Sequence, residues 1–431
     1  MREIDVAVEA ARKVRDAPAV TLTDHADITF VLRSKVFAPI SPESGHGGQW
    51  HTMVIRDTPA DLHGDDHFER RRILTSLLKR TAVIREYEHT YLRPEMHKLL
   101  ASAPDTADGR PRLELVSELR RVQIKLIARL IGVDRLVDSD RSDDAFEKLL
   151  SEVERGVRSK FVDDPEAVIR LALQAQRMMA EEYFAPALER RTEIYARVKA
   201  GNAVIEDMPQ DLFSLIVRHR EHYDKFGDDA VYREASNMFS AAVGSSVNAA
   251  CFAVSYLDAW LKEHPEDAAK RTDTAFLARC FAEALRLGQT NSLFRTAMED
   301  AALPSGIQIR AGEVAIIDRP AGNAALEQGG TSAVPGVHEF DPNRSLAKNT
   351  AQYGLAFGGG AHMCVGRELT VANFPRSEAQ SEDDTVGLGV RMFQMLEQLD
   401  VKPEPDGLEL APDMSGRPTW KRLVVTCRRP G

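Results

Sequence analysis

The sequence predicts a mostly α-helical protein with small peripheral β-sheets, built as a single domain over residues 1–431. Long stretches place apolar side chains at helical spacing, whereas strand-like stretches are short and lie near the two ends of the chain. No linker or internal repeat divides it. The composition is that of a soluble globular protein, with 43% apolar residues, 28% charged residues and a formal net charge of −10.

Helical periodicity is clearest in four stretches, where apolar residues recur every three to four positions. These stretches are residues 113–134, 165–199, 209–219 and 275–287. A fifth helix is predicted over residues 235–265. It contains the longest uncharged run, ASNMFSAAVGSSVNAACFAVSYL, which is long enough to span a bilayer. Its five serines and two asparagines would be costly in lipid, so the pattern favours a helix buried in a soluble core and no membrane association.

Four short stretches have strand character. AVTL (19–22) and ITFVL (28–32) are predicted strands near the N-terminus. Residues 307–318 are predicted to form a hairpin, and LVVTC (423–427) is predicted to form the last strand. Residues 320–337, rich in Gly, Ala and Pro, are predicted to form a loop.

The cysteines and the N-terminal residues indicate the cellular compartment of the protein. Cys251, Cys280, Cys364 and Cys427 are far apart and form no CxxC pair, which argues against a structural zinc site and against a disulfide framework. The first 18 residues are charged and lack the apolar core of a signal peptide. We therefore expect a cytoplasmic protein, and the acidic balance argues against nucleic acid as a partner.

One short segment carries distinctive chemistry, the stretch FGGGAHMCVGRELT over residues 357–370. Its glycines permit a tight turn and a close approach of the backbone to a large flat ligand. Gly366 marks the point where a helix should begin, so backbone N–H groups there would lower the pKa of the Cys364 thiol and hold a thiolate. The alternative from the residues alone is an inert buried cysteine in a loop.

The wider pattern, Phe357-x-x-Gly360-x-x-x-Cys364-x-Gly366, resembles the haem-binding signature of the cytochrome P450 family. The resemblance implies the cytochrome P450 fold and a bound haem b (iron protoporphyrin IX). It also implies that Cys364 is the thiolate ligand of the iron and that Phe357 packs beside the cysteine loop.

Two further motifs agree with the resemblance. Glu283 and Arg286 match the family's Glu-x-x-Arg on a helix, and Arg344 in FDPNR supplies a third member. The resemblance implies that these three form a structural network, not a catalytic one.

Four basic residues stand at family positions that pair with the haem propionates. They are His67, Arg71, Arg295 and His362. His67 and Arg71 are four apart on a predicted helix and so share a face. The alternative for each residue alone is a solvated surface charge.

The chain departs from the family on both sides of the predicted haem. After the cysteine, Pro375 and a polar run predict that the helix stops early and a loop is inserted. On the distal helix, the family's acid–Thr pair for proton delivery is missing. The polar candidates in its place are Asn248, Ser246 and Ser245. The alternative is that the two serines only bond helix carbonyls and allow close packing.

The resulting hypothesis is a haem-thiolate monooxygenase that inserts one atom of dioxygen into a small or mid-sized organic substrate. Electrons would come from a separate ferredoxin and ferredoxin reductase. A basic patch for the donor is predicted from Arg70, Arg72, Lys79, Arg80 and Arg367. Because the acid–Thr pair is missing, three alternatives stay open: peroxide-driven oxygenation, a non-oxygenating haem-thiolate reaction, or a non-catalytic haem sensor.

Overall fold

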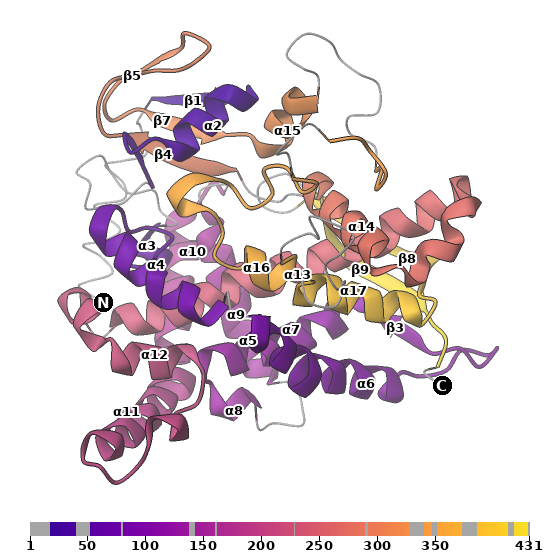
Figure 1. The fold of residues 1–431 in the computed structure, drawn as a ribbon, viewed down its shortest axis with the longest axis horizontal. Helices are drawn as coiled ribbons and strands as arrows, with labels where there is room; N and C mark the ends of the chain where they lie inside the picture. The colour runs from indigo at the N-terminus through magenta and orange to yellow at the C-terminus, as the bar shows by residue number, and fades with distance from the viewer. Residues whose placement is uncertain are drawn as a thin grey trace.

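Helices make up most of the protein, and the sheets are small and lie at its periphery (Figure 1). The structure, a computed structural model, describes residues 18–39, 52–78, 81–137, 143–159, 162–227, 229–288, 292–327, 340–346, 351–372, 386–412 and 418–429. The α-helices are α2 (His25–Arg33), α3 (Thr52–Ile55), α4 (Gly64–Leu78), α5 (Thr81–Tyr87), α6 (Arg93–Ser102), α7 (Leu115–Ile131), α8 (Asp134–Val137), α9 (Asp144–Val157), α10 (Pro165–Met179), α11 (Ala185–Lys199), α12 (Leu212–Arg218), α13 (Asp229–Glu263), α14 (Thr274–Leu287), α15 (Arg319–Glu327), α16 (Arg367–Thr370) and α17 (Leu388–Gln398). Shorter 3-10 and π turns are η2 (Glu88–Leu92), η4 (Ala180–Phe184), η5 (Ile205–Asp207), η6 (Arg220–His222), η7 (Asp224–Phe226), η8 (Pro265–Thr272) and η9 (Gly360–His362).

The strands form three separate sheets. They are β1 (Ala19–Leu22), β2 (Phe37–Ala38), β3 (Arg112–Glu114), β4 (Leu293–Ala297), β5 (Ala301–Ala302), β6 (Gln308–Ile309), β7 (Val314–Ile317), β8 (Lys402–Pro412) and β9 (Pro418–Thr426). The largest sheet has the order β1-β7-β4-β2, with β1 parallel to β7 and the other pairs antiparallel. The second has the order β3-β9-β8, and the third pairs β5 with β6. Figure 1 shows the four-stranded sheet, α2 and α15 at one end of the molecule and α8, α11 and α12 at the other.

Helix α13 is the central element of the core. It packs against α7, α9, α14 and α17, and its buried face runs from Ala230 to Leu257. By length and composition it is the one described helix that could cross a membrane, but 61% of its most apolar window is buried inside the protein. The apolar side chains of α13 therefore pack in the protein core, as the sequence predicts.

Most predicted helices are confirmed, with bounds set by their caps. The carboxylate of Glu114 accepts hydrogen bonds from the first N–H groups of α7, and Gly132, at a φ of 100°, ends that helix. The long helix predicted over residues 165–199 is present as α10 and α11, joined by a π-turn. Helix α12 lies within the predicted stretch 209–219 and begins at Leu212, with Asp211 as its N-cap.

The strand predicted for ITFVL (28–32) is wrong, because these residues lie in helix α2. Asp24 caps that helix by accepting hydrogen bonds from two backbone N–H groups. Ile28, Val31 and Leu32 then bury one helical face. Tertiary burial at spacings of three and four outweighs the β-propensity of a short run.

Two further predictions near the four-stranded sheet need correction. The expected hairpin over residues 307–318 does not form, since β6 pairs with β5 and β7 pairs with β1 and β4. The expected loop over residues 320–337 begins as helix α15, and residues 328–339 lie outside the described part of the chain. The other short strands, β1 and β9, are where the sequence predicts them.

The early helix stop after the cysteine is confirmed. Helix α16 ends at Thr370, five residues before Pro375, and α17 begins at Leu388. Gly387, just before α17, lies against Thr370, the last residue of α16: a Cβ on Gly387 would be 2.5 Å from the carbonyl carbon of Thr370. Residues 373–385 lie outside the described part of the chain.

Candidate active site

The cysteine loop is folded by its own backbone. The N–H of Cys364 donates to the carbonyl of Phe357 at 2.9 Å, which closes the loop, and α16 begins three residues after the cysteine. Gly358 and Gly360 have φ values of 68° and 65°, a region that side chains with a Cβ rarely adopt. A Cβ on Gly360 would lie 1.9 Å from the carbonyl oxygen of Leu32. This glycine therefore makes room for helix α2.

The Cys364 side chain is accessible to solvent, although many protein atoms lie around it. Burial raises the pKa of the thiol, while the N–H groups of Gly366 and Arg367 and the charge of Arg71 lower it. The backbone N–H groups lower the pKa as predicted, but burial is the larger effect, so the expectation that they hold a thiolate in the absence of a metal is wrong. A metal cation would supply the missing stabilisation, because a coordinated thiol loses its proton.

A basic cluster lies beside the cysteine loop. The rings of His67 and His362 are 3.8 Å apart, and Arg71 donates from Nη2 to the carbonyl of Met363. Arg295, on β4, is buried at 8% exposure. The structure therefore brings His67 and Arg71 of α4 to the cysteine loop, as the sequence predicts.

The charges in this cluster are poorly compensated. Burial lowers the pKa of His67 to about 4 and that of His362 to about 2, with repulsion from neighbouring arginines adding to the effect. Burial alone lowers the pKa of Arg295 to about 10. The Nε2 of His67 and both ring nitrogens of His362 are buried with no hydrogen-bond partner. Among the described residues, no carboxylate forms an ion pair with these side chains. Since buried polar groups are normally paired, the cluster fits the carboxylates of an anionic ligand.

A buried ionic network lies behind the loop. Glu283 has no exposed surface, and its Oε1 is 2.6 Å from Nη2 of Arg286. Its Oε2 is 2.8 Å from Nε of Arg344 and accepts a 3.3 Å hydrogen bond from Gln352. Arg344 also donates to the carbonyl of Gln352. The network ties α14 to the segment that leads into the cysteine loop, which confirms the predicted triad and its structural place.

Comparisons with known proteins agree with this geometry. No protein-family model and no curated protein sequence matches the chain. Among solved structures, P450BioI in complex with an acyl carrier protein ligated to hexadec-9Z-enoic acid aligns with a TM-score of 0.66 at 16% identity, over 99% of this chain and 98% of that one. CYP164A2 of Mycobacterium smegmatis, in a ligand-free state, aligns with a TM-score of 0.65 at 15% identity, over 99% and 100%. The chain has the cytochrome P450 fold.

A third solved P450, CYP109E1 of Bacillus megaterium in complex with corticosterone, aligns with a TM-score of 0.64 at 15% identity, covering 98% of this chain and 97% of that one. At such identities the likeness establishes the fold.

The three distal candidates on α13 of this P450 fold have different surroundings. Asn248 is buried, and its carboxamide oxygen accepts a 3.1 Å hydrogen bond from the backbone N–H of Trp420 on β9. Ser245 is exposed although it lies in the middle of a core helix, and its hydroxyl donates to the carbonyl of Ala241 at 2.6 Å. Ser246 is half-buried. Ser245 therefore has the accessible hydroxyl, whereas the Asn248 oxygen already has a partner.

One predicted surface residue of this P450 fold is a core residue. Arg70 has no exposed surface, forms an ion pair with Glu234 of α13, and stacks 3.6 Å from the ring centroid of Tyr223. The Tyr223 hydroxyl donates to the same carboxylate at 3.2 Å. Arg70 therefore does not belong to a basic docking patch. The sequence RRR over residues 70–72 gave no signal for which arginine points inward.

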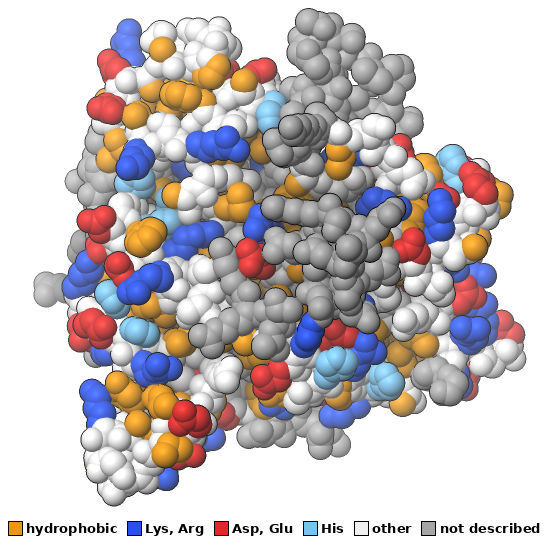
Figure 2. All heavy atoms as spheres, viewed as in Figure 1, with side chains coloured by type: hydrophobic (Ala, Val, Ile, Leu, Met, Phe, Trp, Pro, Cys, Tyr) orange, Lys and Arg blue, Asp and Glu red, His pale blue; other side chains and the backbone are white. Residues whose placement is uncertain are grey.

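The remaining members of the predicted patch are scattered. Arg72 is exposed and pairs with Glu69, and Arg367 pairs with Glu368. Lys79 and Arg80 lie outside the described residues. Figure 2 shows Lys and Arg side chains interspersed with Asp and Glu on the face that presents α4 and α16.

Sequence reasoning also missed two residues beside the cysteine loop. The ring of His63 stacks on that of His362 at 6.0 Å, and Arg319 donates to the carbonyl of Ala356. Arg319 also lowers the pKa of Cys364 by its charge. His63 precedes helix α4, which begins at Gly64, so the helical spacing of His67 and Arg71 gives no signal for it.

Proposed function

We propose that this chain is a haem-thiolate monooxygenase of the cytochrome P450 type. The observation that carries the proposal is the solvent-accessible Cys364 thiol on a closed backbone loop, beside four basic side chains that lack carboxylate partners among the described residues. A large flat ligand that carries a thiolate-binding metal and two carboxylates would bind both the Cys364 thiol and the four basic side chains. Haem b is the cofactor with that chemistry, and its iron, when ligated by a thiolate, supplies dioxygen activation.

The chain's own residues have distinct tasks in this proposal. Cys364 supplies the thiolate, and the N–H groups of Gly366 and Arg367 donate to its sulfur and tune its electron density. His67, Arg71, Arg295 and His362 would bind the propionates through charge-assisted hydrogen bonds. Phe357 positions the cysteine by accepting the N–H of Cys364.

Ser245 is the proposed proton-handling group on the distal helix. Its hydroxyl donates to the Ala241 carbonyl and can accept a proton-donating water through its lone pairs. Asn248 and Ser246 are secondary candidates, since Asn248 is engaged with β9 and Ser246 is half-buried. No carboxylate lies next to Ser245 in the sequence, so the proton must reach it through water or a substrate group.

The substrate is a small or mid-sized organic molecule, and the oxidant is dioxygen. Residues 41–55, the middle of α13 and residues 290–294 are the proposed substrate-facing segments. Within them, Val247 is buried, Phe294 is half-buried on β4, and Trp50 lies outside the described residues. A ferredoxin served by a reductase is the proposed electron source, and the proposed location is the cytoplasm.

The cofactor is tested by the absorption spectrum of the reduced protein with carbon monoxide. A thiolate-ligated haem gives a Soret band displaced to the red of the histidine-ligated position, and Cys364→His should remove that displacement. Retention of the thiolate spectrum in Cys364→His would refute the assignment of the ligand.

The reaction class is tested separately. Product formed with ferredoxin, reductase and dioxygen supports the monooxygenase. Product with peroxide alone supports the peroxide-driven alternative, and conversion of a substrate without either oxidant supports the non-oxygenating one. The absence of product from a broad substrate panel under all three conditions supports a haem sensor.

A further inference from the structure

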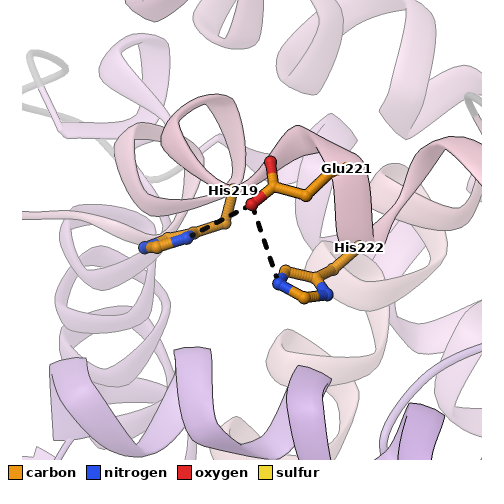
Figure 3. Close-up of side chains that lie close together, drawn as sticks. All are labelled: His219, Glu221 and His222. Atoms are coloured by element: carbon orange, nitrogen blue, oxygen red, sulfur yellow. Dashed lines mark ion pairs between the residues drawn. The ribbon is translucent and has the colours of Figure 1, made fainter.

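Two histidines and a glutamate converge outside the cysteine site, at the junction between α12 and η6. His219 follows the last residue of α12, and Glu221 and His222 lie in η6 (Figure 3). In a 3-10 turn, residues three apart eclipse one another, which places His219 and His222 on the same side. Their candidate ligand atoms and that of Glu221 all lie within 4.8 Å of one another.

The contacts within this cluster do not satisfy its members. The Glu221 Oε1 atom is 3.9 Å from Nδ1 of His219 and 3.7 Å from Nε2 of His222, too long for hydrogen bonds. Among the described residues, Glu221 has no Lys or Arg partner. A carboxylate oxygen therefore faces two ring nitrogens across a gap with no bond between them.

A second carboxylate approaches from helix α4. The Glu69 Oε2 atom is 4.0 Å from Nε2 of His222. The same oxygen accepts a 2.8 Å hydrogen bond from Arg72. Glu69 lies outside the three residues whose ligand atoms are within 4.8 Å of one another, so its side chain would have to rotate toward His222 to become a fourth ligand. It comes from a segment about 150 residues earlier in the sequence.

The spacing suits a tetrahedral metal ion after a small side-chain shift. Ligand bonds of about 2.0–2.1 Å to zinc place neighbouring ligand atoms about 3.3 Å apart. The two measured nitrogen–oxygen distances exceed this by roughly half an ångström. The Glu221 side chain is 66% exposed and that of His219 is 38% exposed, so both can rotate inward without disturbing the core.

We propose that His219, Glu221, His222 and Glu69 form a binding site for a divalent cation of the zinc class. Imidazole nitrogen and carboxylate oxygen are ligands that zinc takes in proteins. The bound ion would link η6 to α4, the helix that also carries His67 and Arg71. The proposal stands independently of the proposed function, since it does not use the cysteine site.

Zinc titration against a fluorescent chelator tests the site, with the full-length, haem-loaded and untagged protein. We expect one zinc ion per chain. His219→Ala and His222→Ala should each weaken zinc binding at least tenfold, about 1.4 kcal/mol. Glu69→Gln should weaken it by a smaller factor of about two to ten, because three ligands remain.

A matched control is available at the end of α13. The Nδ1 of His264 lies 3.3 Å from Oε1 of Glu266, a histidine–glutamate pair that has no second histidine. His264→Ala should leave zinc binding unchanged. Thermal unfolding without zinc verifies that each variant is folded before zinc affinities are compared, because these side chains are only partly exposed and the ring of His264 stacks on Trp260.

Three outcomes would overturn the proposal. The first is wild-type protein that takes up no zinc, and the second is uptake that survives the double substitution His219→Ala/His222→Ala. The third is unchanged affinity in Glu69→Gln, which would remove the link to α4.

Discussion

The Glu283 network predicts that two glutamates in nearly identical local geometry have very different effects on stability. Glu283 pairs with Arg286 three residues later on a helix at 2.6 Å, and Glu118 pairs with Arg121 at the same spacing at 2.7 Å. The side chains of the first pair are 0% and 3% exposed, whereas those of the second are 28% and 46% exposed. Burial is therefore the variable that distinguishes the two sites.

The substitution Glu283→Gln removes the buried negative charge that pairs with the guanidinium groups of Arg286 and Arg344. Removing one partner of a buried ion pair costs about 3–5 kcal/mol, whereas an exposed pair at this spacing is worth about 0.3–0.5 kcal/mol. For a chain of 431 residues the unfolding entropy is about 0.9 kcal/mol per kelvin. Glu283→Gln should therefore lower the unfolding midpoint by about 3–6 °C, and Glu118→Gln by less than about 1 °C.

Both variants are measured as haem-loaded protein by thermal unfolding followed with far-UV circular dichroism. The haem content of each sample is matched by absorbance before the comparison. Equal shifts in the two variants would refute the reasoning, because they would show that the buried network contributes no more than a surface pair.

Three other expectations concern the cysteine loop and its surroundings. Gly360→Ala should lower the free energy of unfolding by about 2–5 kcal/mol. The added Cβ would clash with a backbone carbonyl of α2, and the positive φ of this residue disfavours any side chain. Gly358→Ala has a similar φ but a nearest neighbour at 3.3 Å, and should cost only about 1–2 kcal/mol; equal losses in urea unfolding would contradict the close contact. In haem-free protein, burial lowers the pKa of His67 to about 4, so the unfolded state binds its proton first as the pH falls. Stability should drop between about pH 6.5 and pH 4, and His67→Gln should reduce that slope; an unchanged slope would show that His67 is not the group involved. Ser245→Ala should lower ferredoxin-driven turnover about a hundredfold and preserve peroxide-driven turnover, whereas a larger loss in Asn248→Ala would reverse their proposed roles.

The sequence predicts the closed cysteine loop because the residues that form it are close together in the chain. The residues from Phe357 to Gly366 close their own loop through the bond between Cys364 and Phe357, so their spacing alone specifies the geometry. The Glu283 triad is also predicted, since two of its members share a helical turn.

The wrong predictions have a common physical cause, because each depends on residues that are far away in the sequence but close in the fold. ITFVL becomes a helix because α2 must bury Ile28 and Leu32 against the four-stranded sheet and the cysteine loop. Arg70 turns inward because Glu234, 164 residues later, supplies its counter-ion. The pKa of Cys364 is raised because tertiary burial outweighs the neighbouring N–H groups. None of these partners is visible in a local window of sequence.

The contact between Gly387 and Thr370 has a practical consequence for engineering. Because the chain departs and re-enters at adjacent points, the length of the connection between them hardly affects the helices on either side. Closing a connection of twice the length costs only about 0.6 kcal/mol. A reporter or an electron-donor domain could therefore be inserted between Ala372 and Val386 while α16 and α17 keep their places.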